Sequence, residues 1–277
     1  MNHLLRDLAP ISAAAWREID DEATKTLKLT LAARKLVDFV GPKGWDYSAV
    51  GLGRAKPIET PPAKGVEAHM RQVKPLVELR VPFELSRAEL DTIARGAKDA
   101  DLQPVVEAAR TIAITENQIV FHGYPAGDIQ GIAQAAHKVT VTLTDDFERY
   151  PVMVGSALSV LRNGGIAGPY AIALGPRCYV GLTETVTSGG YRVYDHVRRL
   201  LDGPIVWSLG VDGAVVLSLR GGDFELTVGQ DLSIGYLDHD SKTVQLYIQE
   251  SLTFQVLDAD AAVPMAYESA ASSQGSA

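Results

Sequence analysis

Two long segments of the chain carry apolar side chains at helical spacing. In residues 12–36 the apolar positions recur at steps of three or four residues and form one stripe: Trp16, Ile19, Ala23, Leu27 and Leu31. Residues 101–122 keep the same spacing throughout, and Gly123 follows as a stop signal. We predict one helix over each segment, and the second is long enough to be a spine on which a sheet packs.

Shorter apolar runs between turn signals predict strands and further helices. Alternating apolar residues predict strands in five segments: 75–85, 171–174, 224–228, 243–250 and 252–257. Asp212-Gly213 lies between two more apolar runs, 205–209 and 214–219, and predicts a two-residue hairpin. Short helices are predicted between Pro151 and Gly164, in 177–185 and in 192–201, and another begins at Ser86, where Glu89 completes a capping box. This mixture predicts an α+β fold.

Residues 41–74 lack both helical and strand periodicity over most of their length. Glycine and proline interrupt only short apolar runs there, which indicates an extended excursion or a two-stranded arm. Connections this long are uncommon inside compact domains, and an isolated two-stranded ribbon is marginally stable in water. We therefore expect either an arm supported by a neighbouring subunit or a flexible loop.

Composition and charge narrow the class of protein. The chain has 277 residues, 46% of them hydrophobic, and a formal net charge of -8, which argues against general attraction to nucleic acid or to an anionic membrane. Basic and acidic residues balance within residues 1–40, so no basic arm for packaging nucleic acid is predicted there. Cys178 is the only cysteine, which excludes an intramolecular disulfide and favours a reducing compartment. We expect neither a signal peptide nor a membrane span.

No constellation of residues predicts catalysis, and no catalytic, cofactor-binding or metal-binding residue is assigned. The six histidines are scattered, and none stands in a His-Glu-x-x-His frame. Residues 231–235 resemble a serine-hydrolase elbow around Ser233, but Asp231 stands where the first glycine belongs. A serine hydrolase using Ser233 is therefore kept only as a remote alternative.

Eight short segments distributed along the chain together carry a family resemblance. They are residues 8–10, 16–20, 34–38, 41–45, 168–170, 220–224, 229–236 and 250–254, of which Arg220-Gly221-Gly222-Asp223-Phe224 and Gly229-Gln230-Asp231-Leu232-Ser233-Ile234-Gly235-Tyr236 are the most distinctive. In this order they resemble the family-1 encapsulins, linocin-like bacterial shell proteins with the HK97 phage-capsid fold. The resemblance extends from about Leu4 to Leu257.

The resemblance implies a domain organisation. Residues 1–40 would be an interior-facing N-terminal helical segment of the P domain, and 41–74 the E-loop that pairs with a neighbour. Residues 75–146 would hold the P domain with spine helix 101–122, and 147–216 the A domain. Residues 217–264 would return as P-domain strands, and 265–277 would be a disordered tail. The loop 183–191 would line a five-fold pore through Thr187, Ser188, Gly189 and Gly190.

The resemblance also implies partners and a binding site. The chain would assemble with itself, as 60 subunits with T=1, into a cytoplasmic nanocompartment. The shell would enclose a dye-decolourising peroxidase or a ferritin-like protein, which is held by its C-terminal targeting peptide. Carried over to matching positions, the peptide-binding residues would be Arg34, Asp38, Phe39, Ile234 and Tyr236.

Two features set limits on the resemblance. Flavin-binding members have a tryptophan before Glu-Leu-Asp, whereas Ala88 precedes Glu89 here, so no flavin and no other cofactor is predicted. A phage major capsid protein of the same fold is the other structural alternative. It would package DNA, against which the charge balance of residues 1–40 counts.

Overall fold

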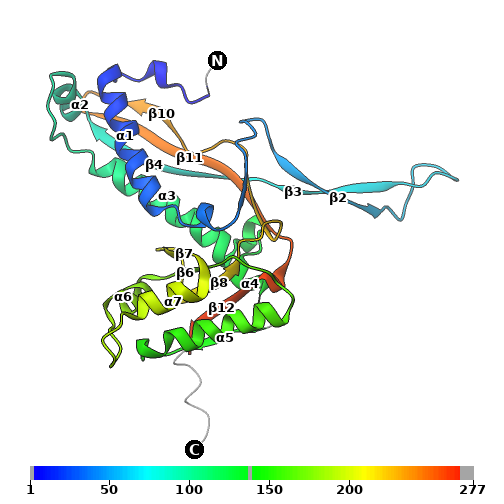
Figure 1. Cartoon of the computed structure of the whole chain (residues 1–277). Helices are drawn as coiled ribbons and strands as arrows, with labels where there is room; N and C mark the ends of the chain where they lie inside the picture. The colour runs from blue at the N-terminus through cyan, green and yellow to red at the C-terminus, as the bar shows by residue number, and fades with distance from the viewer. Residues whose placement is uncertain (1–2, 137–138, 269–277) are drawn as a thin grey trace, which may run out of the picture.

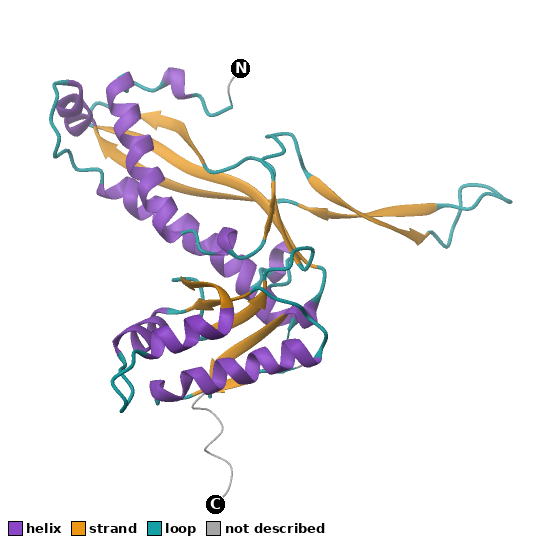
Figure 2. Ribbon diagram, in the orientation of Figure 1, coloured by secondary structure: helices purple, strands orange, loops and turns teal. Residues whose placement is uncertain are grey.

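The computed structural model describes residues 3–136 and 139–268. It contains two five-stranded sheets, each with helices against it, and a separate two-stranded ribbon. Figures 1 and 2 show the two sheets one above the other and the ribbon reaching far out to one side. No helix in the described part of the chain is long and apolar enough to cross a membrane.

The first sheet is built around one long strand, β11 (Thr243–Val256). Its other members are β4 (Val77–Ser86), β9 (Phe224–Val228), β10 (Ser233–His239) and β1 (Asp38–Val40). At Ile248 the strand pairs with Ile234 of β10 on one side and with Val81 of β4 on the other, and at Leu252 with Val228 and Val77. Strands β10 and β9 therefore follow each other along one edge of β11. Strand β1 pairs with β9 in parallel.

Three helices cover this sheet. They are α1 (Ala13–Thr30), α2 (Arg87–Ala94) and the spine α3 (Gln103–His122). The apolar stripe of α1 buries Ile19 and Ala23 in a core shared with Ile112 of α3 and Leu246 of β11. Burying an isoleucine side chain such as that of Ile19 stabilises the fold by about 1.5–3 kcal/mol. The hydroxyl of Ser12 accepts from the N–H of Ala15 at 3.1 Å, so the cap of α1 lies at the predicted residue.

Helix α1 ends six residues earlier than predicted, because Asn117 of α3 holds its C-terminus. The side-chain oxygen of Asn117 accepts from the N–H groups of Ala32 and Ala33, both at 2.9 Å, and its NH₂ donates to the carbonyl of Thr30 at 2.8 Å. A short 3-10 helix, η2 (Ala33–Lys35), follows. Because Asn117 is fully buried, these bonds replace the continuing helix in satisfying the backbone.

The second sheet has the strand order β5-β12-β8-β6-β7. Its strands are β5 (Val141–Leu143), β6 (Tyr170–Leu174), β7 (Asp202–Trp207), β8 (Ala214–Ser218) and β12 (Ala262–Tyr267). The helices of this half are α4 (Ile132–Ala135), α5 (Tyr150–Asn163), α6 (Pro176–Glu184) and α7 (Val193–Leu201). Four more 3-10 turns complete the chain: η1 (Arg6–Leu8), η3 (Pro125–Gly127), η4 (Phe147–Arg149) and η5 (Ala259–Ala261).

Several strand predictions are wrong in their pairing or extent. Strands β7 and β8 do not form a hairpin at Asp212-Gly213, because fully buried β6 lies between them and pairs with both. The strands predicted at 243–250 and 252–257 are one continuous strand, β11. Strand β12 was not predicted. It joins the second sheet beside β8, although residues 217–264 were assigned to the P domain and 265–277 to a disordered tail. Residues 269–277 lie outside the described part of the chain.

The predicted capping box of α2 is also wrong. The Ser86 side chain makes no capping hydrogen bond, since Ser86 is the last residue of β4. The Glu89 carboxylate instead accepts from the N–H of Asp101 at 3.0 Å. Glu89 therefore fixes the loop before α3 rather than the start of its own helix.

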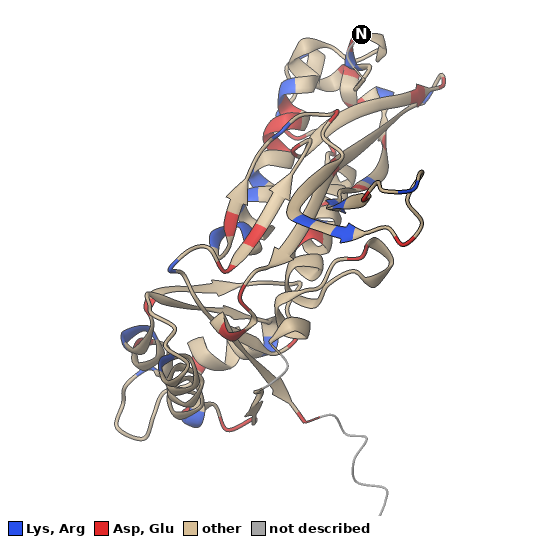
Figure 3. Cartoon of the chain, turned by 90° about the vertical axis from the view of Figure 1, so that its right-hand side faces the viewer, with Lys and Arg blue, Asp and Glu red and all other residues tan. Residues whose placement is uncertain are grey.

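The ribbon consists of β2 (Ala49–Pro57) and β3 (His69–Pro75), paired antiparallel. It is the arm anticipated from residues 41–74, and Figure 1 shows it projecting away from both sheets. At its base Lys74 forms an ion pair with Asp128 at 3.0 Å and also donates to the Asp128 carbonyl. Figure 3 shows basic and acidic residues interspersed over the arm and the rest of the chain.

Candidate peptide groove

A hollow of about 240 Å³ lies between α1 and the edge strand β10. Its apolar lining comes from Ala23 and Leu27 of α1, from Leu232 just before β10, and from Ile234 and Ile248 of the sheet. Leu4, Arg6, Asp20, Thr24 and Ser233 complete the wall. The stripe of α1 and the inward face of β10 therefore form one groove, which contains Ile234 of the predicted peptide-binding residues.

Arg34, which follows α1 on η2, is held by three carboxylates from distant parts of the chain. Its Nε and Nη2 donate to the Glu116 carboxylate, the shortest contact being 2.6 Å. Nη1 donates to Asp231 at 2.8 Å and Nη2 to Glu250 at 3.1 Å. Every nitrogen of the guanidinium is thus engaged within the chain. Arg34 is placed to hold α3, β11 and the segment just before β10 together.

The cluster around Arg34 carries more negative than positive groups. The side chains of Glu116 and Glu250 are completely buried, whereas Asp231 is 41% exposed. Burial, followed by the neighbouring Glu116 charge, raises the pKa of Glu250 well above its usual value of 4.5, against the opposing effect of Arg34. For Arg34 burial opposes the charge, but the bonds to Glu116 outweigh it and raise the pKa. Glu250 therefore holds its proton to a higher pH than an exposed glutamate does.

Phe39 and Asp38 are neighbours on β1, and their side chains contact different parts of the protein. The Phe39 ring is 37% exposed and packs under the Arg34 guanidinium, 4.9 Å from ring centroid to Cζ. The Asp38 carboxylate accepts from the N–H of Gly222 at 2.6 Å. Gly221 and Gly222 have φ of 81° and 80°, a conformation that favours glycine. Asp38 therefore fixes this predicted turn, while Phe39 offers an apolar surface beside Arg34.

Ile234 and Tyr236 share one face of β10. Ile234 lies in the core against α1 and lines the hollow. The Tyr236 hydroxyl bonds to Nδ1 of His239, and its backbone N–H donates to the carbonyl of Leu4 at 2.9 Å. The structure thus brings together Arg34 and Phe39 at one side and Ile234 in the hollow, with Tyr236 farther along the strand. That Arg34, Asp38, Phe39, Ile234 and Tyr236 bind a peptide stays a prediction.

Sequence patterns did not indicate the other residues that complete this region. They are the buried carboxyl groups of Glu116 and Glu250, the partly exposed carboxylate of Asp231, and Leu4 and Arg6, which form part of the wall of the hollow. One signal was available: Glu116 lies within the apolar spine helix, and Glu250 interrupts an apolar strand. Charged residues at buried positions are rare unless they are paired.

The loop between α6 and α7 contains the predicted pore residues. It is closed by a bond from the N–H of Thr187 to the carbonyl of Tyr191 at 2.8 Å and by one from the N–H of Gly190 to the carbonyl of Thr187 at 2.8 Å. Gly190 has φ of 80°, which this tight turn requires. Ser188 and Gly189 lie at its tip. A short, internally bonded loop is suited to line an opening, and that role of Thr187, Ser188, Gly189 and Gly190 stays a prediction.

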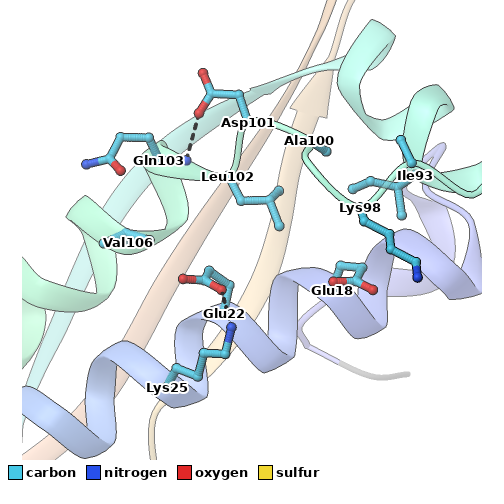
Figure 4. Close-up of a pocket in the computed structure, with 11 residues that line it drawn as sticks. Glu18, Glu22, Lys25, Ile93, Lys98, Ala100, Asp101, Leu102, Gln103 and Val106 are labelled. Carbon is cyan, nitrogen blue, oxygen red and sulfur yellow. Dashed lines mark hydrogen bonds and ion pairs between the residues drawn. The ribbon is translucent and has the colours of Figure 1, made fainter.

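A larger hollow of about 370 Å³ lies between α1 and the loop that joins α2 to α3. Figure 4 shows Leu102 and Ile93 in this hollow and charged side chains from α1 around it. Glu22 pairs with Lys25 at 3.0 Å, and Asp101 accepts from the N–H of Gln103 at 2.9 Å. These charges serve the chain's own structure, and none of the predicted site residues lies here.

The geometry around Ser233 does not match a hydrolase elbow. Ser233 begins a strand rather than standing between a strand and a helix, and its hydroxyl donates to the Asp231 carbonyl at 2.7 Å. Within residues 3–136 and 139–268, no group of three or more His, Cys, Asp or Glu is arranged to hold a metal ion.

Comparison with known proteins decides the family. A family profile described as "Encapsulating protein for peroxidase" matches residues 1–253. The chain is 57% identical over 270 residues to a type 1 encapsulin shell protein of Rhodospirillum rubrum, covering 96% of each chain. The chain belongs to the encapsulin family. Another such encapsulin, from Mycobacterium tuberculosis, is 46% identical over 267 residues, which cover 96% of this chain and 100% of that one.

Solved structures agree with the fold of this encapsulin. A virus-like particle from Pyrococcus furiosus superposes with a TM-score of 0.63 at 15% identity, covering 90% of this chain and 98% of that one. A structure from Mycobacterium phage Bobi gives 0.55 at 12% identity over 87% and 91% of the two chains. At these identities the likeness concerns the fold alone, and it confirms the predicted HK97-like capsid fold. The encapsulin relatives are named as shell proteins.

Proposed function

We propose that this encapsulin closes into an icosahedral shell of 60 subunits (T=1) in the cytoplasm. We further propose that the shell encloses an enzyme held by its C-terminal peptide in the groove between α1 and β10. The projecting arm formed by β2 and β3 is the observation that supports assembly into a shell. The groove is the observation that supports binding of a cargo peptide. Small molecules would enter and leave the shell through a pore lined by the loop between α6 and α7.

The arm needs a surface that its own chain does not offer. Met70 and Val73 of β3 are 63% and 54% exposed, and Figure 2 shows the ribbon extended away from both sheets. A two-stranded ribbon with exposed apolar side chains is marginal in water. Packing on a neighbouring copy would bury these side chains, and closed symmetry would give every arm the same support.

The cargo proposal is supported by groove chemistry and by the family. An apolar hollow beside a strand edge, with Asp231 exposed near one end, fits a short peptide with apolar anchors. The family description "Encapsulating protein for peroxidase" favours a dye-decolourising peroxidase as the enclosed enzyme. A ferritin-like protein is the second candidate from the sequence resemblance.

Closed particles are the expected result when the chain is expressed alone. Sixty copies of a 29.7 kDa chain give a mass of roughly 1.8 MDa, measurable by native mass spectrometry. Negative-stain microscopy should show uniform spheres, and the absorbance ratio should show no nucleic acid. Particles filled with DNA would favour the phage-capsid alternative. A small oligomer at high concentration would contradict the assembly proposal.

Thr24→Arg is expected to empty the shells of cargo without preventing assembly. Thr24 is exposed on α1 and lines the hollow, so a long charged side chain would fill the groove while leaving the core intact. We expect at least a tenfold loss of the protein that co-purifies with shells from the source cells, measured by quantitative mass spectrometry. Leu29→Arg is the matched control, since Leu29 is 75% exposed and lies outside the hollow. Equal loading of both variants would rule out the groove.

A further inference from the structure

Strand β10 has one free edge in the described part of the chain. It pairs with β11 along one side, and the order of the sheet places no strand on the other. The hollow adjoins this edge, since it is lined by Ile234 of β10 and by Leu4, whose carbonyl bonds to Tyr236. An unpaired strand edge presents backbone donors and acceptors to any extended segment that lies against it.

The hydrogen bond at Tyr236 identifies which backbone groups point outward. Its N–H donates to the carbonyl of Leu4 at 2.9 Å, away from β11. Because backbone groups alternate sides along a strand, the N–H and C=O of Ile234 point to the same outer edge, while those of Gly235 point to β11. Among the described residues, Leu4 alone contributes a backbone bond to this edge. The outward groups of Ile234 are therefore available.

The N-terminal strap, which we define as residues 3–8, already lies on this edge, and its side-chain contacts are partly exposed to solvent. Arg6 pairs with Asp20 at 2.7 Å and stacks over Trp16 at 3.9 Å, but the ion pair is partly exposed. His3 stacks on Trp45 with ring centroids 4.1 Å apart. Leu5 has φ of 53°, a left-handed conformation that leucine rarely adopts. Exposed pairs and a strained residue make a weak closure.

We propose that the bound peptide adds to β10 as an extended strand, bonding to the outward N–H and C=O of Ile234 and displacing the N-terminal strap from Tyr236. The proposal rests on the proposed function, that the groove takes a cargo peptide. The occupant is an extended segment with apolar side chains at alternate positions. The bond from Tyr236 to Leu4 shows that this edge forms backbone hydrogen bonds with an added segment. The hollow beside Ile234 can hold apolar side chains of the peptide.

Hydrogen exchange in loaded and empty shells tests the strand addition directly. We expect the Ile234 amide to exchange at least tenfold more slowly in loaded shells, because it gains a backbone acceptor. The Gly235 amide, which faces β11 in both states, is the internal control and should not change. The amides of Leu8 and Ala9, now bonded to the strap carbonyls of Leu5 and Arg6 at 3.0 and 3.1 Å, should exchange faster once the strap is displaced.

Arg6→Ala tests the strap by itself. Losing the Asp20 ion pair and the Trp16 contact should weaken the closure and raise cargo loading per shell by about two- to tenfold. Arg17→Ala removes the same charge from the exposed side of α1 and should leave loading unchanged. Cargo-loaded shells with unaltered Ile234 exchange, or with equal loading in both variants, would overturn the edge proposal alone. Shells that never carry cargo would overturn the proposed function with it.

Discussion

Glu250→Gln should make the stability of the protein less sensitive to rising pH. In the folded protein burial and Glu116 raise the pKa of Glu250 well above the value of 4.5 expected in the unfolded chain. Between 4.5 and the raised pKa the folded state holds a proton that the unfolded state has released, so stability falls as pH rises. One such proton is worth about 1.4 kcal/mol per pH unit. Glutamine keeps the shape and does not titrate.

The measurement compares thermal unfolding of wild-type and Glu250→Gln shells from pH 5 to pH 8. The difference between them should grow with pH in favour of the variant. The other charges facing this site, Arg34, Glu116 and Asp231, are the same in both proteins. Glu107→Gln, on the exposed side of α3, is the control and should give a constant offset. A constant offset for Glu250→Gln as well would mean that Glu250 is ionised throughout.

Asn117→Ala is expected to cost about 3–5 kcal/mol of folding free energy, since it leaves two buried N–H groups and a carbonyl without partners. These are the groups of Ala32, Ala33 and Thr30 at the end of α1. The loss should lower the unfolding temperature and loosen the Arg34 region that follows. Denaturant unfolding of the unassembled chain, or thermal unfolding of shells, gives the magnitude.

Two further variants separate the hydrogen bonds of Asn117 from the loss of its volume. Asn117→Asp keeps the acceptor that serves Ala32 and Ala33 but loses the donor to Thr30, and it buries a charge. Gln118→Ala changes the exposed neighbour on the same helix and should shift stability by less than about 0.5 kcal/mol. An Asn117→Ala protein as stable as Gln118→Ala would show that water replaces the three bonds.

Much of the fold could be predicted because local patterns agree with it. The stripe of α1, the periodicity of the spine α3 and the glycines of the turn at 221–222 act over a few residues. The arm could be predicted because residues 41–74 lack helical and strand periodicity over most of their length. The end of α1 could not, because Asn117 lies 85 positions from the Ala32 amide that it binds. The hairpin predicted at Asp212-Gly213 is wrong for the same reason. Strand β6, from an earlier part of the chain, lies between β7 and β8 and pairs with both.

The sequence indicated single residues of the candidate groove but not the contacts between them. Arg34 was predicted as a peptide-binding residue, but its partners Glu116, Asp231 and Glu250, which lie 82, 197 and 216 positions away, were not foreseen. No local pattern reveals such pairing. Ile234 was recognisable because its segment is distinctive, whereas the N-terminal strap carries only ordinary surface residues.

The place of β12 in the second sheet has a consequence for the timing of synthesis. In the described part of the chain β5 pairs with β12 alone, and β8 pairs with β12 on its other side. Residues 262–267 leave the ribosome about 120 residues after β5, which at 5–20 residues per second is a delay on the order of 10 s. During that interval the first half of the chain, with the arm, already exists, but the second sheet is incomplete. Until β12 is made, a growing chain cannot join β5 to β8, so the second sheet is completed after the first.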